Sequence, residues 1–330
     1  MRVAAALLAF PLLLTSGAAV SADDGRPSRT VERATELPPR RDMPKELVIL
    51  VGGLGSSATD GTWDAVSARY RDDARIEIRR FGADPRFPYD TVGDIDANGL
   101  RLRDEIRSVA SRYSAIHLVT HSMGGAVADR AFAQGLSAAD GIRTYVALAA
   151  PHNGATAARI AQGTLDLAGD EALELRAATA ALIHDPATPA VRDLAERPTA
   201  PPSAGLTRLD LRLATDLLVA GRDSRIQGVG SRTFLPSSFA TLEGHGGVLR
   251  DPMVLDMITT TIATGAPPPD ARGAVLREAT ELASRTADEL AALLLLAAAA
   301  AALALAQALR IARYPRLFTR PAAERALLGR

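Results

Sequence analysis

The chain has 330 residues, and its 38 lysines and arginines balance 38 aspartates and glutamates, so that the formal net charge is zero. A neutral chain has no general attraction for nucleic acid, and we predict no nucleic-acid partner. Because the sequence contains no cysteine, disulfides, thiolate chemistry and cysteine-ligated metals are excluded. We predict neither a metal ion nor a cofactor. The apolar fraction of 47% is sufficient for a sizeable core.

Residues 1–22 have the order of a secretory signal. Arg2 precedes an apolar stretch over 3–14, and small residues follow as far as Ala22, after which we expect cleavage. An uncleaved N-terminal anchor is the alternative, and in both cases the body of the protein leaves the cytoplasm. Residues 23–44 are polar, charged and proline-rich, which predicts a flexible leader.

Residues 45–265 alternate between strand and helix patterns, which predicts an α/β fold with a mostly parallel sheet and helices on both faces. Strands are expected at 47–51, 75–79, 116–119, 144–150, 209–213 and 239–242. Helices are expected at 63–70, 100–113, 126–132, 155–183 and 251–264. Residues 84–99 are too rich in turn residues for regular structure and should border the site. Prolines interrupt the pattern over 184–205, and we interpret 155–205 as a small helical cap over the site.

The stretch Ser114–Ala133 predicts a strand, a tight turn and a helix. A serine at the apex of such a turn has a strained backbone and an exposed hydroxyl, and glycines beside it let the following helix pack closely. Ser122 is therefore our candidate nucleophile, and a plain helix N-cap is the alternative interpretation. The turn departs from the usual G-x-S-x-G pattern, because Thr120 replaces the first glycine.

A serine hydroxyl becomes a good nucleophile only when a base removes its proton, and that base needs an anionic partner. Of the five histidines, His245 lies in a glycine-rich loop after the last expected strand, from which it can reach the site. Asp216 and Asp223 both precede it. Asp216 directly follows the 209–213 strand, at the sheet edge where ligands bind, so we prefer it as the acid and keep Asp223 as the alternative.

Glycines also follow the first expected strand, in the segment 52–55. A loop of this kind could bind phosphate through its backbone, but the lysine that a nucleotide-binding loop requires is absent. We therefore predict an oxyanion hole, formed by the backbone N–H groups of Leu54 and Met123.

The C-terminal part of the chain predicts a membrane anchor. Residues 266–289 read as a proline-rich linker and an amphipathic helix, and Leu290–Leu309 contains only alanine and leucine apart from Gln307. About 20 apolar residues are enough for a helix to cross the hydrocarbon core. Arginines in 310–330 predict a cytoplasmic tail, so that the protein would be a single-pass protein of the cell membrane with its catalytic domain outside. A water-soluble alanine-rich helix is the alternative.

Several segments of 45–265 occur in the order found in one superfamily. They are VGGLGSS at 51–57 with Trp63, HLVTHSMGG at 117–125, ALAAPHNG at 147–154, TDLLV at 215–219 and EGHGGVLRDP at 243–252. With these segments the chain resembles α/β-hydrolases of the lipase/esterase type, in particular lipase-like and GPI-inositol-deacylase-like serine hydrolases. The resemblance implies the α/β-hydrolase fold, and Gly52 stands where many members carry a histidine. The site residues that it implies are Ser122, Asp216, His245, Leu54 and Met123.

These observations predict an exported, membrane-anchored serine hydrolase that cleaves carboxylic esters or lipids through an acyl-enzyme on Ser122. The same acyl-enzyme could pass its acyl group to an alcohol, which would make the protein an acyltransferase. An inactive binding protein on a hydrolase fold is the third reading, because fold does not fix function. Retention of a serine, an aspartate and a histidine at the expected places favours the enzyme.

Overall fold

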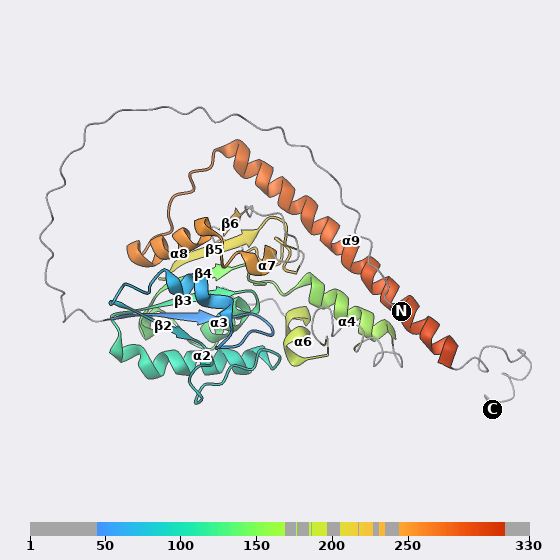
Figure 1. Cartoon of the computed structure of the whole chain (residues 1–330), viewed down its shortest axis with the longest axis horizontal. Helices are drawn as coiled ribbons and strands as arrows, with labels where there is room; N and C mark the ends of the chain where they lie inside the picture. The colour runs from blue at the N-terminus through green and yellow to red at the C-terminus, as the bar shows by residue number, and fades with distance from the viewer. Residues whose placement is uncertain are drawn as a thin grey trace, which may run out of the picture. The chain divides into compact units, whose positions relative to one another are not determined.

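The structure is a computed structural model of the chain (Figure 1), and it describes residues 45–168, 187–196, 205–216, 218–226, 231–234 and 244–313, together with Arg176 and Asp185. Several expectations lie outside the described residues. They are the signal at 1–22, the leader at 23–44, the strand at 239–242, parts of the cap at 155–205, and the tail beyond 313.

The centre of the fold is a sheet of six parallel strands in the order β2-β1-β3-β4-β5-β6. The strands are β1 Glu46–Val51, β2 Ile76–Arg80, β3 Ala115–His121, β4 Ile142–Leu148, β5 Thr207–Leu213 and β6 Ser231–Phe234. The chain runs from β1 to the edge strand β2 and then returns past β1 to β3. This reversal creates a crevice at the carboxyl ends of β1 and β3, which is where ligands bind in open parallel sheets.

Some helices pack on the faces of the sheet, and others extend beyond the ends of its strands (Figure 1). They are α1 Asp64–Ala68, α2 Ile95–Val109, α3 Met123–Ala133, α4 Thr156–Ala168, α6 Pro189–Glu196, α7 Gly244–Gly247, α8 Pro252–Thr264 and α9 Ala274–Arg313, with 3-10 turns at Gly61–Trp63, Ala110–Arg112 and Ala138–Asp140. The apolar run of β1 explains the layers: Leu47 and Ile49 join the core under α2 and α3, whereas Val48 and Leu50 join the core under α1 and α8. A strand buried on both faces needs a continuous apolar run rather than an alternating one. The predicted α/β fold with a parallel sheet and helices on both faces is confirmed.

Three local expectations were wrong. Helix α2 begins at Ile95 and not near residue 100, because the Asp94 carboxylate accepts the N–H of Ala97 at 2.7 Å and caps a helix inside the turn-rich segment. Residues 189–196 form α6 within the proline-rich break, with Pro189 in the first turn, where proline is tolerated. His245 lies in the short helix α7 and not in an open loop.

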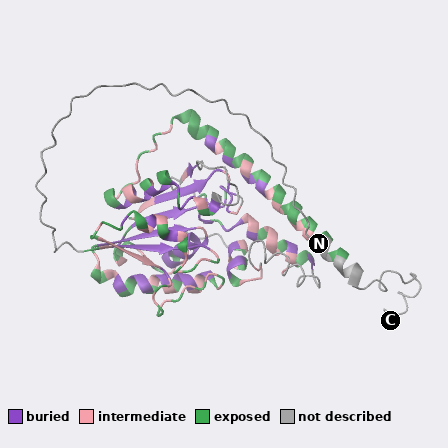
Figure 2. Cartoon of the chain, in the orientation of Figure 1, coloured by how far each residue is buried: buried purple, intermediate pink, exposed green. Residues whose placement is uncertain are grey.

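The C-terminal helix α9 is continuous over 40 residues, so the expected amphipathic and apolar segments form one rod. Within the described part of the chain it is the one helix long and apolar enough to cross a membrane, judged by length and composition. Most of its surface is exposed (Figure 2), but its first half packs on β6 and its second half reaches α4. The helix is therefore joined to the α/β domain over part of its length.

Candidate active site

Ser122 occupies the sharp turn between β3 and α3. Its backbone has φ 55° and ψ −134°, a left-handed conformation that is rare for a residue with a side chain. Close packing holds the turn in place: a Cβ atom on Gly124 would lie 2.3 Å from the carbonyl oxygen of Val51, and one on Gly125 would lie 2.3 Å from the Cβ atom of Ala150. Side chains at these glycines would push α3 away from the sheet, so the elbow depends on both of them.

The two departures from the family pattern fit this arrangement. Thr120 is fully buried, and its hydroxyl donates to the carbonyl oxygen of Val146 at 3.4 Å, so the position accepts a small polar side chain. A Cβ atom on Gly52 would lie 2.2 Å from the hydroxyl oxygen of Ser56, so a side chain at this position would displace that of Ser56. Tyr89 lies in the segment 84–99, which we expected to border the site. Its hydroxyl donates to the carbonyl oxygen of Gly52 at 2.8 Å and so holds the loop after β1 in place.

His245 and Asp216 form a buried pair. The Nδ1 atom of His245 donates to Oδ2 of Asp216 at 2.6 Å, and the other carboxylate oxygen accepts the N–H groups of Leu218 and Val219 at 2.8 and 3.0 Å. Burial lowers the pKa of His245, but the charge and hydrogen bond of Asp216 outweigh it and raise the pKa above the ordinary value. With Nδ1 engaged, Nε2 remains for proton transfer.

Asp223, the alternative acid, is engaged elsewhere. Its side chain is only 2% exposed. Its carboxylate accepts the N–H of Thr156 at 2.7 Å and a guanidinium N–H of Arg159 at 2.8 Å, both at the start of α4. Anions are stable at a helix N-terminus, which explains why this aspartate is buried. Its contacts anchor α4 rather than orient His245.

A cavity of about 530 Å³ joins the candidate residues. Ser122, His245, Leu54 and Met123 all line it. Met123 is the first residue of α3, and the first N–H groups of a helix have no partner within the helix, so this N–H can donate to a ligand. Among the described residues, no hydrogen bond joins the Ser122 hydroxyl to His245, although such bonds often tighten only when substrate is present.

Apolar side chains form most of the remaining cavity wall. From α4 they include Ala157, Ala158, Ile160, Ala161 and Leu165, and from α9 they are Leu295, Ala298, Ala299 and Ala302. The catalytic groups therefore lie at the polar end of a largely apolar cavity. Helices α4 and α9 form this apolar part of the cavity wall.

His121 has a role that the sequence did not suggest. Its side chain is almost fully buried, and its Nε2 atom donates to the backbone carbonyl oxygen of His245 at 2.8 Å, which fixes the tautomer. Burial and the nearby charge of His245 lower the pKa of His121 to about 3, so the ring is neutral. The two rings lie 4.7 Å apart, and His121 thereby holds the backbone of the candidate base.

A second histidine, His152, is buried in an ionic network. Its Nδ1 atom is hydrogen-bonded to Asp129 on α3, and its Nε2 atom lies 3.4 Å from a carboxylate oxygen of Asp210 on β5. Arg208 donates to the other oxygen of Asp210 at 2.7 Å. Burial lowers the pKa of His152, but the two carboxylates outweigh it and raise the pKa to about 9. The network ties β5 to the helix that starts at Ser122.

The family comparison agrees with this geometry. Residues 41–166 match a family model described as "Putative serine esterase (DUF676)", which confirms the expected resemblance to serine hydrolases. This segment is serine esterase-like. It includes Ser122, Leu54 and Met123 but ends before Asp216 and His245, so the placement of these last two beside the elbow comes from the structure. A comparison with curated proteins gave no match.

Solved structures of several lipases and esterases are similar to the chain. The mature form of Bacillus licheniformis lipase BlEst2 is 14% identical with a TM-score of 0.46, over 71% of this chain and 96% of that chain. Aspergillus fumigatus lipase B is 16% identical with a TM-score of 0.44, over 76% and 63%. A thermophilic esterase from Thermogutta terrifontis is 18% identical with a TM-score of 0.43, over 66% and 90%. Scores below 0.5 at these identities carry no information on the substrate of this chain.

Proposed function

We propose that the protein is a serine hydrolase of carboxylic esters, with Ser122 as nucleophile, His245 as base and Asp216 as the acid that orients it. One observation carries the proposal: a strained serine and a histidine paired at 2.6 Å with a buried aspartate line one cavity. A solvated or N-capping serine would need neither partner. The match of residues 41–166 to a serine esterase family supports the same reaction class.

The proposed mechanism gives each step to one group. Nε2 of His245 takes the proton of the Ser122 hydroxyl while the oxygen attacks the ester carbonyl carbon. Charge then develops on the carbonyl oxygen, where the N–H groups of Leu54 and Met123 stabilise it. The imidazolium, held by Asp216, returns the proton to the leaving alcohol, and an acyl-enzyme remains. Water attacks this acyl group by the same route and releases the acid.

The cavity wall indicates apolar acyl groups as substrates. Fully burying a large apolar side chain contributes about 1.5–3 kcal/mol, so a cavity lined by leucine, isoleucine and alanine favours an acyl chain over a polar one. We therefore place lipid-like esters first among the substrates. An acyl transfer reaction would use the same groups with an alcohol in place of water.

We further propose that the protein is exported and held in the cell membrane by α9, with its catalytic domain outside and its C-terminus in the cytoplasm. Leu290, Leu293, Leu294 and Leu296 are each more than half exposed, which is costly in water and favourable in lipid. If Leu290–Leu309 crosses the bilayer, the helix rise of 1.5 Å per residue puts Leu295 roughly 8 Å below the surface. Leu295, Ala298 and Ala299 then lie within the outer leaflet, where lipid acyl chains are found, and Ala302 lies near the bilayer centre.

A fluorophosphonate probe tests the reaction, because it reacts with activated serines. We expect the full-length protein in detergent to be labelled and the Ser122→Ala variant to remain unlabelled. Labelling of that variant at an unchanged rate would move the nucleophile elsewhere. Hydrolysis of p-nitrophenyl esters of increasing chain length then measures the acyl preference, and a preference for the shortest ester would contradict the lipid proposal.

Topology is tested separately. Protease added to intact spheroplasts should digest residues 45–265 and spare the tail beyond residue 309. Truncation after Arg272 should give a protein that keeps activity on soluble esters and loses relative activity on esters embedded in a membrane. Digestion of the tail with protection of the domain would invert the proposed orientation.

A further inference from the structure

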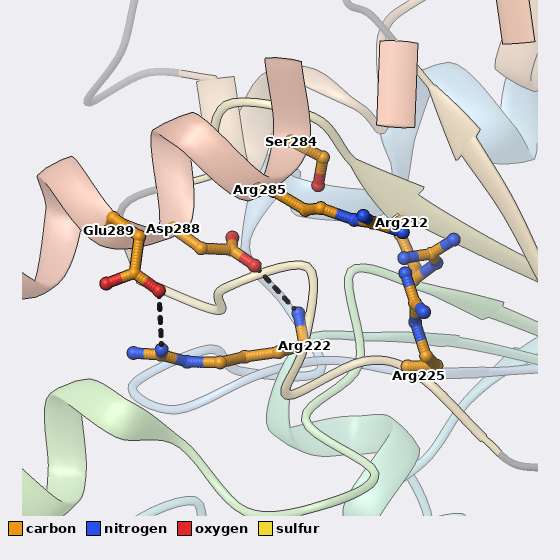
Figure 3. A pocket seen from close by; sticks show the side chains of 7 residues that line it. All are labelled: Arg212, Arg222, Arg225, Ser284, Arg285, Asp288 and Glu289. Atoms are coloured by element: carbon orange, nitrogen blue, oxygen red, sulfur yellow. Dashed lines mark hydrogen bonds and ion pairs between the residues drawn. The ribbon is translucent and has the colours of Figure 1, made fainter. Parts of the chain in front are cut away.

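A second pocket of about 280 Å³ lies between the end of β5, the loop 221–226 and helix α9 (Figure 3). Its lining residues are Arg212, Arg222, Arg225, Ser284, Arg285, Asp288 and Glu289. No described residue lines both this pocket and the catalytic cavity. Four guanidinium groups around one pocket are an unusual concentration of positive charge, and like charges brought together require a reason.

The nearby carboxylates do not neutralise these arginines. Asp288 accepts the backbone N–H groups of Gly221 and Arg222 at 2.7 and 3.1 Å, so the loop backbone already uses its oxygens. The carboxylate of Glu289 is 76% exposed and lies 3.6 Å from Arg222, which is a weak surface pair. Glu281, outside the lining, accepts from Arg212 and Arg225 at 2.8 and 3.1 Å. One positive charge remains in excess even when all three carboxylates are counted.

Arg212 gives an independent indication of a ligand. The residue is 4% exposed, and its Nε atom is buried with no hydrogen-bond partner among the described residues. Burial lowers the pKa of this guanidinium. A buried donor without an acceptor costs free energy, and a small displacement of the Arg212 side chain toward an anion in the pocket would recover it.

Arg285 projects from α9 toward the same pocket (Figure 3). It has no hydrogen bond or ion pair with any other residue in the described part of the chain. Its guanidinium is therefore available to a ligand without breaking an existing contact, unlike that of Arg225, which is paired with Glu281. Arg285 is an exposed residue, so a ligand can reach its guanidinium from solvent.

We propose that this arginine pocket binds a phosphate group, carried either by a free phosphate or by a phospholipid headgroup. Guanidinium groups present planar N–H forks that match phosphate oxygens, and several forks around one anion give charge-assisted hydrogen bonds. The exposed Glu289 side chain can turn away when the anion binds. The pocket is a site of its own and does not depend on the hydrolase activity.

The position of the pocket on α9 makes a headgroup the natural source. Glu289 lines the pocket, and Leu290 begins the apolar segment that we propose to enter the membrane. Lipid phosphates lie at that boundary between polar and apolar surroundings. The pocket would then fix the depth at which the catalytic domain sits, because Asp288 clamps α9 to the loop that follows Asp216.

Binding can be measured by the thermal unfolding of the full-length protein in neutral detergent micelles. One arm compares sodium phosphate with sodium chloride at equal ionic strength, which removes general screening. The other compares ether-linked phosphatidylglycerol with ether-linked diacylglycerol, which has the same chains without the phosphate. Ether lipids cannot be cleaved by an esterase, so the result is independent of the proposed reaction.

We expect the unfolding midpoint to rise by about 3 °C at a phosphate-bearing ligand concentration tenfold above its Kd. Arg285→Gln should weaken binding about tenfold, and Arg285→Glu should abolish it. Arg277→Gln, two turns earlier on the exposed surface of α9, is the matched control and should bind normally. A shift with inorganic phosphate supports a site for free phosphate, and a shift with the phospholipid alone supports a headgroup site. No shift in either arm, or equal losses in Arg285→Gln and Arg277→Gln, would overturn the proposal.

Discussion

Among the residues that the structure describes, two buried histidine–aspartate pairs can be compared. His245 pairs with Asp216 and His152 pairs with Asp129, in both cases through Nδ1 of the ring. In both, burial opposes protonation and the carboxylate outweighs it, so that both pKa values are raised. The Nδ1–carboxylate contact and the direction of the pKa shift are the same in both pairs and do not distinguish them.

They differ in what surrounds the second ring nitrogen. His152 is 1% exposed, and its Nε2 atom faces Asp210, so both nitrogens are held by carboxylates. His245 lines the cavity that also holds Ser122, and a single carboxylate contacts its ring. A base must exchange protons with a reacting group, whereas an imidazolium fixed between two anions stabilises the structure. Access, and not the strength of the pairing, separates a candidate catalytic histidine from a structural one.

The largest expected effect comes from removing the proposed nucleophile or base. Ser122→Ala and His245→Ala should each lower kcat for short p-nitrophenyl esters by about a million-fold, because a triad acts as a unit. Circular dichroism and the unfolding midpoint should stay close to the wild-type values. Rates within tenfold of the wild type in either variant would remove that residue from the proposed mechanism.

The second prediction compares the two aspartates. Asp216→Asn should lower kcat about 10,000-fold, because an amide stabilises the wrong tautomer and cannot support the imidazolium. The same change removes the influence that raises the pKa of His245, so the acid limb of the kcat/KM profile should shift to lower pH.

Asp223→Asn is the matched control. It should lower the unfolding midpoint, since the carboxylate caps α4, and change kcat by less than tenfold. If kcat instead fell steeply in Asp223→Asn and not in Asp216→Asn, the catalytic acid would be Asp223.

The third prediction addresses the structural pair. A folded pKa of about 9 lies above the unfolded value of about 6.5, so protonated His152 stabilises the fold fully below pH 6.5, and this contribution disappears as the pH rises through 9. At pH 6 the contribution is about 3 kcal/mol. His152→Gln should therefore lower stability strongly at pH 6 and little at pH 9.5, with turnover per folded molecule retained. An equal loss of stability at both pH values would mean that the ring is not protonated in the fold.

The sequence predicted most of the sheet because burial on two faces leaves a local mark. The run at 47–51 is apolar throughout, the run at 116–119 is apolar except for His117, and the structure buries both completely. The sequence analysis missed the edge strand β6, whose sequence is SRTF. An edge strand has a neighbour on one side only, so its residues need not be mostly apolar and the sequence shows no clear strand pattern.

The candidate site likewise has a part that local sequence predicts and a part that it does not. Ser122, Asp216 and His245 stand out because glycines or a strand end mark each of them within a few residues. The contact of His121 with His245 joins residues 124 positions apart, and that of Asp223 with Thr156 joins residues 67 apart. Contacts of such separation depend on how the layers pack, and one sequence carries no local pattern for them.

The smallest expected effect tests how the catalytic pair is held. His121 is neutral and lies off the path of proton transfer, but its ring donates to the carbonyl oxygen of His245. His121→Ala removes this hydrogen bond and leaves a cavity beside the base, so His245 should occupy its productive position for less of the time. We expect kcat to fall about tenfold, equivalent to ~1.4 kcal/mol, with KM little changed.

A control separates positioning from general loss of packing. His117 lies on the same strand, is also fully buried, and contacts Glu46 instead of the site. His117→Ala should destabilise the fold in the same way and leave kcat per folded molecule unchanged. In His121→Ala, the rate of fluorophosphonate labelling should fall in parallel with kcat, since both depend on His245 activating Ser122. Equal kcat values in the two variants would show that the His121 hydrogen bond does not position the base.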